Sequence, residues 1–229
     1  MKRGKKYIEA AKKLDRQELH STARAVEIVK ELARAKFDET VELSLKMNLK
    51  KSATVRDTLV LPNQFTSEKK ILVFAKGDKA QEALDCGATY VGDDELIQKI
   101  RDGWLDFDIA VATPDMMKDV GRLGPILGRR GLMPNPKTGT VTFDVKAAID
   151  ELRKGRVEFR SDKTGVVHLA VGKVSMPPEK ITENIESVVA EVERRRPADA
   201  KGAFIKSIAV SSTMGPGVKV ATAAGETGN

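Results

Sequence analysis

The residues Ile71-Leu72-Val73-Phe74-Ala75 form the longest unbroken apolar run in this chain of 229 residues. Five such residues in a row are typical of a β-strand that is covered on both faces, as strands of parallel sheets are. Because a membrane-spanning helix needs about 20 apolar residues, the run is too short to cross a bilayer, and no membrane segment is expected. The run therefore predicts the first strand of a parallel α/β layer.

The residues after this run alternate short strands with helices. Acidic residues at Asp93-Asp94-Glu95 suit a helix N-terminus, and Gly87 and Gly103 are typical of positions where helices end. The predicted order is a helix over 78–87, a strand over 89–91, a helix over 93–103, a strand over 107–112, a long irregular loop over 121–139, a strand over 140–143 and a helix over 144–155. This order is typical of a three-layer, Rossmann-like α/β fold.

Both ends of the chain show a different pattern. From Phe37 to Leu49 apolar residues alternate with polar ones, and Thr40 and Glu42 lie on the polar side. Such alternation predicts a strand with one buried and one polar face, as in antiparallel sheets. Further strands are expected over 54–61, 156–160, 166–171, 204–211 and 218–222, helices after Ser21 and Pro177, and a hairpin loop over 161–165.

This change of pattern predicts two domains, and the charge follows the same division. Residues 1–66 and 156–229 are expected to form a discontinuous α+β domain with an antiparallel sheet, into which residues 67–155 are inserted as the parallel α/β domain. The formal net charge is +7. The first segment holds 15 Lys and Arg against 9 Asp and Glu, the last holds 11 against 9, and the middle holds 14 against 15. The two ends therefore carry +8, so a polyanion is expected to bind there.

The cysteine content and the first residues bear on the compartment. Cys86 is the single cysteine, which excludes an internal disulfide and a multi-cysteine metal site. No apolar segment follows Lys2 and Arg3, so no secretory signal is expected. We therefore expect the protein in the cytoplasm.

Two enzyme interpretations are open from the sequence. Asp162-Lys163-Thr164-Gly165 begins the phosphorylated-aspartate motif of ion-pumping ATPases, but a hairpin turn accounts for the same residues. No Gly-x-Gly-x-x-Gly follows the strand at 71–75, and residues 124–131 lack the Lys-Ser/Thr pair of a P-loop. A nucleotide-using enzyme built on the middle domain is the alternative function. His20 and His168 lack metal-ligand spacing, so neither a metal nor a cofactor is expected.

Two features of the terminal segments bear on nucleic-acid binding. His168 falls in the middle of a strand, where packing is the first interpretation and a polar contact the second. Residues Ser211 to Gly217 offer hydroxyls and open backbone at a strand end, which suits structured RNA; an ordinary Gly-Pro turn is the alternative. The aromatic residues of these segments, Tyr7 and Phe37 among them, do not cluster in the sequence as they do in proteins that stack single-stranded bases.

Several motifs resemble the bacterial ribosomal protein L1 family. The match runs in order from about Gly4 to Val220, and its most specific parts are Pro134-Asn135-Pro136 and Thr213-Met214-Gly215-Pro216. Arg129 departs from the family, which usually has proline at that position. The remaining matching segments are Lys36 to Glu42, Val91-Gly92, Asp106-Phe107-Asp108, Ala112 to Met117, Glu158-Phe159-Arg160 and Asp162 to Gly165.

The resemblance implies the same two-domain fold and a non-catalytic function. A member of this family binds an irregular junction of large-subunit (23S-type) rRNA, forms the mobile stalk near the tRNA exit site and assists release of deacylated tRNA. It also binds a similar structure in its own operon mRNA and represses translation. Neither a membrane nor a homo-oligomer is implied. Carried over by position, the RNA contacts fall on Phe37, Thr40, Glu42, Asp162, Lys163, His168, Ser211, Thr213, Met214 and Gly215.

Overall fold

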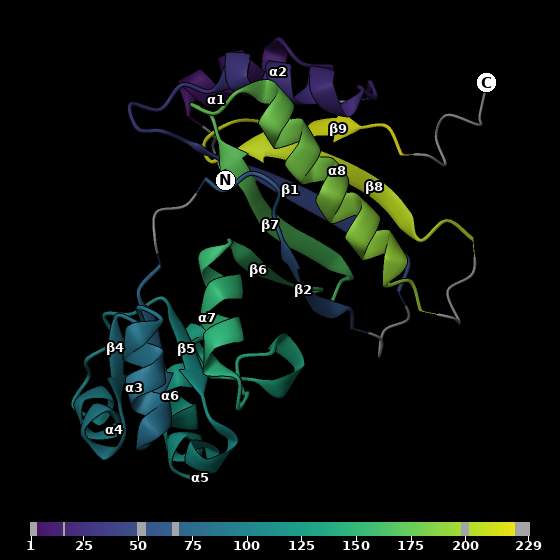
Figure 1. Cartoon of the computed structure of the whole chain (residues 1–229). Helices are drawn as coiled ribbons and strands as arrows, with labels where there is room; N and C mark the ends of the chain where they lie inside the picture. The colour runs from purple at the N-terminus through teal and green to yellow at the C-terminus, as the bar shows by residue number, and fades with distance from the viewer. Residues whose placement is uncertain (1–3, 16, 50–53, 66–68, 198–201, 223–229) are drawn as a thin grey trace. The chain divides into compact units, whose positions relative to one another are not determined.

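The computed structural model describes residues 4–15, 17–49, 54–65, 69–197 and 202–222. These residues divide into two compact units, one within Met1–Phe65 and Glu158–Asn229 and the other within Thr66–Val157. One unit holds an antiparallel sheet and the other a parallel sheet, each with helices, so the predicted fold class is confirmed (Figure 1). In the described parts of the chain, no helix combines the length and the apolar character that crossing a membrane requires.

The first unit is built around the sheet β7-β1-β8-β9, whose neighbouring strands are all antiparallel. Helices α2 and α8 cover one face of this sheet, and Figure 1 shows α8 lying along the strands. The elements of this unit are α1 (Lys5–Lys12), α2 (Thr22–Leu32), β1 (Thr40–Met47), β2 (Arg56–Val60), β7 (Val166–Lys173), α8 (Pro178–Arg194), β8 (Ile205–Ser212) and β9 (Val218–Val220).

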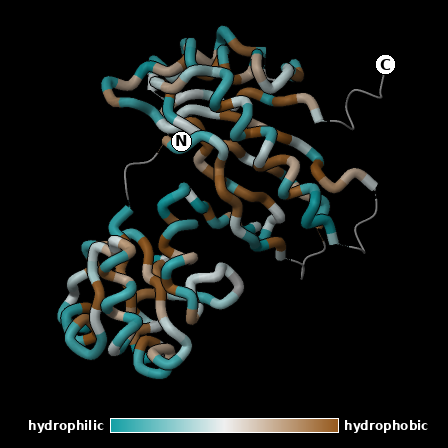
Figure 2. Tube along the Cα trace, in the orientation of Figure 1, coloured by the Kyte–Doolittle hydropathy of each residue, from teal (hydrophilic) through white to brown (hydrophobic). Residues whose placement is uncertain are grey.

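The alternation in β1 has the predicted effect on burial. Leu43 lies opposite Leu169 of β7 and Val210 of β8, and all three are buried on the face that the helices cover. The core of this unit therefore lies between the sheet and its two helices, where Figure 2 shows the strands rich in hydrophobic residues. The other face of β1 carries the polar residues.

The prediction that the strand begins at Phe37 is wrong. Strand β1 begins at Thr40, and the side chain of Phe37 is 57% exposed. The reason is that Asp38 turns aside to accept hydrogen bonds from the amide and hydroxyl of Ser175, at 3.1 and 2.8 Å. Glu39 takes the next buried position instead.

The predicted hairpin at residues 161–165 is correct only for its turn. The amide of Asp162 donates to the carbonyl of Val166 at 2.8 Å, which closes the turn. The flanking strands then separate, because β6 (Arg156–Arg160) pairs with β2 while β7 pairs with β1. Buried Ser161 lies where the strands part: it forms an antiparallel bridge with Val167, while its amide donates to the Val55 carbonyl at 2.8 Å and its hydroxyl accepts from the Val55 amide at 2.9 Å.

The second unit is a parallel sheet of order β4-β3-β5 with helices on both faces. Leu72 and Phe74 of the central strand pack toward α4, α5 and α6, while Ile71 and Val73 pack toward α3 and α7. The double coverage predicted for this run is thus confirmed. The elements are β3 (Ile71–Phe74), α3 (Asp78–Asp85), β4 (Tyr90–Gly92), α4 (Asp94–Arg101), β5 (Ile109–Ala112), η1 (Pro114–Met116), α5 (Met117–Val120), η2 (Gly121–Leu123), α6 (Gly124–Arg130), η3 (Pro136–Thr138) and α7 (Val145–Arg153).

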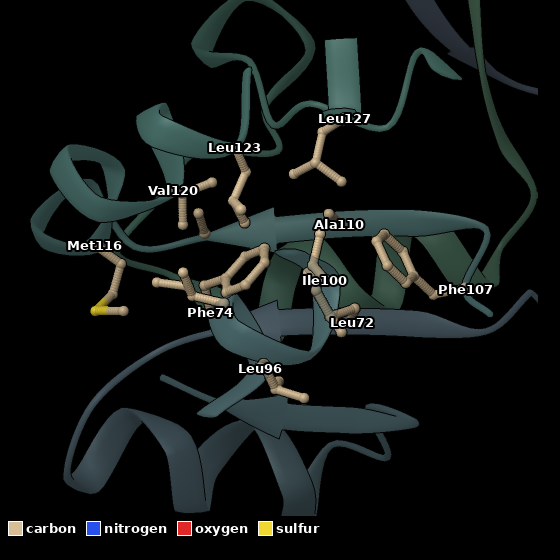
Figure 3. Close-up of a cluster of buried hydrophobic side chains, with 12 residues drawn as sticks. Leu72, Phe74, Leu96, Ile100, Phe107, Ala110, Met116, Val120, Leu123 and Leu127 are labelled. Atoms are coloured by element: carbon tan, nitrogen blue, oxygen red, sulfur yellow. The ribbon is translucent and has the colours of Figure 1, made fainter. Parts of the chain in front are cut away.

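The long irregular loop predicted over 121–139 is wrong, since most of it is helical. Leu123 and Leu127 are fully buried four residues apart, and Figure 3 shows both side chains directed toward the sheet that carries Phe74. This apolar spacing outweighs the glycines, one of which, Gly131, ends α6 with a φ of 72°. Arg129 lies in the last turn of α6, where a cation complements the helix dipole.

Candidate nucleic-acid interface

The open face of the first unit's sheet carries polar side chains in register. Along β1 these are Thr40, Glu42, Ser44 and Lys46, which alternate with the buried residues. Glu42 is exposed and lies opposite Ser211 of β8. The result is a flat polar surface on the side of the sheet that α2 and α8 do not cover, because strand geometry directs successive side chains to opposite faces.

His168 belongs to this open face, so the first interpretation of it as a packed residue is wrong. It is exposed because its neighbours Val167 and Leu169 take the buried positions of β7. The register sets His168 opposite Ser44, and its Nδ1 lies 3.0 Å from the Ser44 hydroxyl oxygen. The polar contact, which was the second interpretation, is the observed one.

The turn after β8 is tied to the first residue of β1. The Thr213 hydroxyl accepts a hydrogen bond from the amide of Thr40 at 3.0 Å and donates to the carbonyl of Thr40 at 3.3 Å. A Cβ at Gly215 would lie 2.5 Å from the Ser212 hydroxyl, so only glycine fits without a shift. Met214 at the tip of the turn is 65% exposed. The turn is therefore held in one position and presents an apolar side chain beside the polar face.

Buried Glu39 holds this turn in place, a role that the sequence did not predict. Its side chain is 1% exposed, and its carboxylate accepts hydrogen bonds from the amides of Arg34, Ala35 and Met214 at 2.8, 2.7 and 2.9 Å. Burial raises the pKa of Glu39, but these hydrogen bonds, led by those from Ala35 and Met214, lower it by more. The charged carboxylate thus joins the segment after α2, the start of β1 and the turn. The sequence did hold one signal for this role: Glu39 is a charged residue at a position where the alternation that starts at Phe37 predicts a buried apolar side chain.

Asp162 lies at the opposite end of the sheet and shapes its own loop. Its carboxylate accepts hydrogen bonds from the amides of Thr164 and Val166, both at 2.8 Å, and from the Thr164 hydroxyl. The Val166 amide, followed by the Thr164 hydroxyl, holds the pKa of Asp162 below its ordinary value. Lys163 beside it is exposed, and Lys46 of β1 donates to the Thr164 carbonyl.

The structure thus brings the predicted residues together in an extended strip, with two ends. Thr40 and Met47 are the ends of β1, and at about 3.4 Å per residue they lie about 24 Å apart. One end of the strip holds Thr40, Glu42, Ser211, Thr213, Met214 and Gly215, and Phe37 lies nearby. The other end holds Asp162 and Lys163, and His168 lies between the two ends. This length suits an extended polymer better than a small molecule.

Among the described residues of the second unit, the end of β3 offers no phosphate site comparable to the strip. Lys76 pairs with Asp94 at 3.7 Å, and Lys79 donates to the Phe143 carbonyl at 2.7 Å. The first turn of α3 carries the acidic residue Asp78, which would repel a phosphate. These cations already contact protein groups, and the chemistry therefore disfavours the nucleotide-using alternative.

Comparison with protein-family models and with curated proteins gives the same family. The model of the ribosomal protein L1p/L10e family matches residues 29–216. The chain belongs to this family. It is 62% identical over 226 residues to the large ribosomal subunit protein uL1 of Treponema denticola, covering 99% of this chain and all of the relative. It is 63% identical over 219 residues to that of Borreliella burgdorferi, covering 96% and 97%.

The sequence resemblance is thereby confirmed. This ribosomal protein is a structural protein and not an enzyme, so the nucleotide-using alternative is set aside.

Proposed function

We propose that this protein, as a component of the large ribosomal subunit in the cytoplasm, binds an irregular junction of large-subunit rRNA through the open face of β7-β1-β8 and the turn Thr213–Gly217. The observation that carries the proposal is the continuity of the two features. Thr213 joins them, because its hydroxyl is bonded to the backbone of Thr40, the first residue of the polar face.

The side chains of the strip match the groups that structured RNA exposes. The Glu42 carboxylate can accept a hydrogen bond from a 2′-hydroxyl or a guanine amine, whereas a phosphate has no donor to offer it. The Ser211 hydroxyl can donate or accept, and Gly215 lets a ribose approach the backbone. Lys163 at the far end is placed to attract a phosphate. Shape and hydroxyl recognition thus predominate on the face, and charge steers association.

Further partners follow from the same surface and from the family. One strip can hold one RNA at a time, so a similar junction in the protein's own operon mRNA would compete with rRNA, and excess protein would repress translation. As part of the stalk, the protein would contact deacylated tRNA at the exit site and assist its release. Both roles rest on the family resemblance.

A charge placed at the tip of the turn tests the proposal. Met214→Asp is expected to weaken binding to a synthetic RNA of the stalk junction by about 10- to 100-fold, because an apolar contact is replaced by a carboxylate beside phosphates. Leu84→Asp is the matched control, since Leu84 on α3 is also half exposed but lies in the other unit. If Met214→Asp and Thr213→Val both bind like the unaltered protein, the strip is not the RNA site.

A further inference from the structure

A hollow of about 800 Å³ adjoins the strip at Met214, and the proposed rRNA contacts on the strip leave it unoccupied. It lies in the first unit between α1, the end of α2, the segment after α2 and the tip of the turn. Phe37 and Met214, both large and exposed, line it together with the half-buried ring of Tyr7. The fold therefore gathers aromatic residues that the sequence scatters.

The charged side chains of the lining, among the described residues, are all cationic. Lys6, Arg34 and Lys36 line the hollow, and its lining includes no Asp or Glu among the described residues. Arg34 is held in place, because its guanidinium donates to the Lys6 carbonyl at 2.8 Å and lies 3.5 Å from the Glu9 carboxylate. Aromatic walls with a cationic rim match a group that has both a flat π-face and a negative charge.

The shape of the hollow is fixed by hydrogen bonds, because buried Glu39 joins two of its walls. The amides of Arg34 and Ala35 belong to one wall, the amide of Met214 belongs to the other, and all three donate to the same carboxylate. Phe37 follows two residues after Ala35. The spacing between the Phe37 side and the Met214 side is thus set by a charged hydrogen-bond centre, as in a preorganised binding site.

We propose that this hollow receives a single unpaired base of the RNA that lies on the strip, with the flanking phosphates against Lys6, Arg34 and Lys36. The inference rests on the proposed function and deepens it, because it assigns residues of α1 to the interface. A nucleotide combines a stacking face with a phosphate one sugar away, and sequence-specific proteins read splayed-out bases on aromatic side chains. Met214 is shared, so RNA following the strip reaches the hollow without a gap.

Abasic substitution tests the proposal. Each unpaired nucleotide of the synthetic stalk-junction RNA is replaced in turn by an abasic one, and the affinity is measured for the unaltered chain and for Tyr7→Ala. At one position the abasic site is expected to weaken binding to the unaltered chain by about 10-fold and to have no further effect on Tyr7→Ala. Ile8→Ala is the matched control, since Ile8 is 45% exposed on the same helix and does not line the hollow.

A fluorescent base gives a second, spectroscopic readout of the same base site. With 2-aminopurine at the sensitive position, emission is expected to change when the full chain binds, and this change should be lost in Tyr7→Ala. Unchanged emission at the sensitive position, or an abasic scan in which no position depends on Tyr7, would overturn the base site. If that occurs while Met214→Asp still weakens binding, the strip stands and only the hollow is misassigned. If Met214→Asp and Thr213→Val bind normally, the proposed function itself fails.

Discussion

Replacing Glu39 by Gln alters the buried hydrogen bonds that hold the turn, without changing any exposed side chain. The two side chains have nearly the same volume, but glutamine turns one acceptor oxygen into a donor. In the structure one carboxylate oxygen accepts from Arg34 and Ala35, and the other accepts from Met214. In either orientation the amide NH₂ therefore faces a backbone N–H.

The less damaging orientation keeps the oxygen toward Arg34 and Ala35 and leaves the Met214 amide without a partner. An unpaired buried donor costs about 1–3 kcal/mol, and the remaining two hydrogen bonds lose their charge assistance. We expect Glu39→Gln to lower the free energy of unfolding of the first unit by about 2–3 kcal/mol. The freed turn should also weaken binding to the stalk-junction RNA.

Two optical signals separate the units in one urea titration. Trp104 is the single tryptophan and packs against Tyr90 and Phe107 in the second unit, so its emission reports that unit. Circular dichroism reports both. The Trp104 transition should stay in place while an earlier transition appears by circular dichroism. Glu42→Gln is the control, since it removes the same charge from the open face and should leave both transitions within about 0.5 kcal/mol. A shift of less than about 0.5 kcal/mol for Glu39→Gln would refute the reasoning.

Three further predictions follow from particular contacts. The pKa values of Glu39 and Asp162 are lowered in the folded state, so the stability that each carboxylate contributes is complete above its unfolded-state pKa and is lost as pH falls through its folded-state pKa. Acid titration should therefore lower the free energy of unfolding of the first unit, and the decrease should be smaller in Glu39→Gln. Leu127→Ala empties a fully buried site on α6 and should cost the second unit about 2–5 kcal/mol, read from the Trp104 transition; a cost below 1 kcal/mol would mean that α6 does not pack. Gly215→Ala places a Cβ 2.5 Å from the Ser212 hydroxyl, so the turn must shift and affinity for the junction RNA should fall; equal affinity would show that the turn's position is unimportant.

Local periodicity was sufficient to predict most elements of the fold. The run Ile71–Ala75 predicted a strand buried on both faces, and the alternation after Thr40 predicted the polar face on which Glu42 and Ser44 lie. Both patterns depend only on which way successive side chains point, and the sequence shows that directly. The predicted loop at 121–139 failed because glycine content was given more weight than the spacing of buried leucines.

What sequence could not show depends on contacts between distant segments. Glu39 and Met214 are 175 residues apart, and no local pattern reveals that one holds the other. Where β6 and β7 part, Ser161 likewise bonds to Val55, 106 residues away. His168 was placed in the correct strand, but its exposure follows from which face α8 covers. Such features arise from tertiary packing rather than from propensity.

Whether the first unit alone carries the RNA site is answered by the affinity of a shortened chain. Residues 1–66 joined to 156–229 by a short glycine-serine linker retain the strip, the turn and the hollow, and the pairing of β2 with β6 keeps the joined segments side by side. Circular dichroism establishes that this chain folds. It is expected to bind the stalk-junction RNA within about 10-fold of the full protein. A folded chain that binds more than about 100-fold more weakly, a loss of about 2.8 kcal/mol, would contradict the assignment.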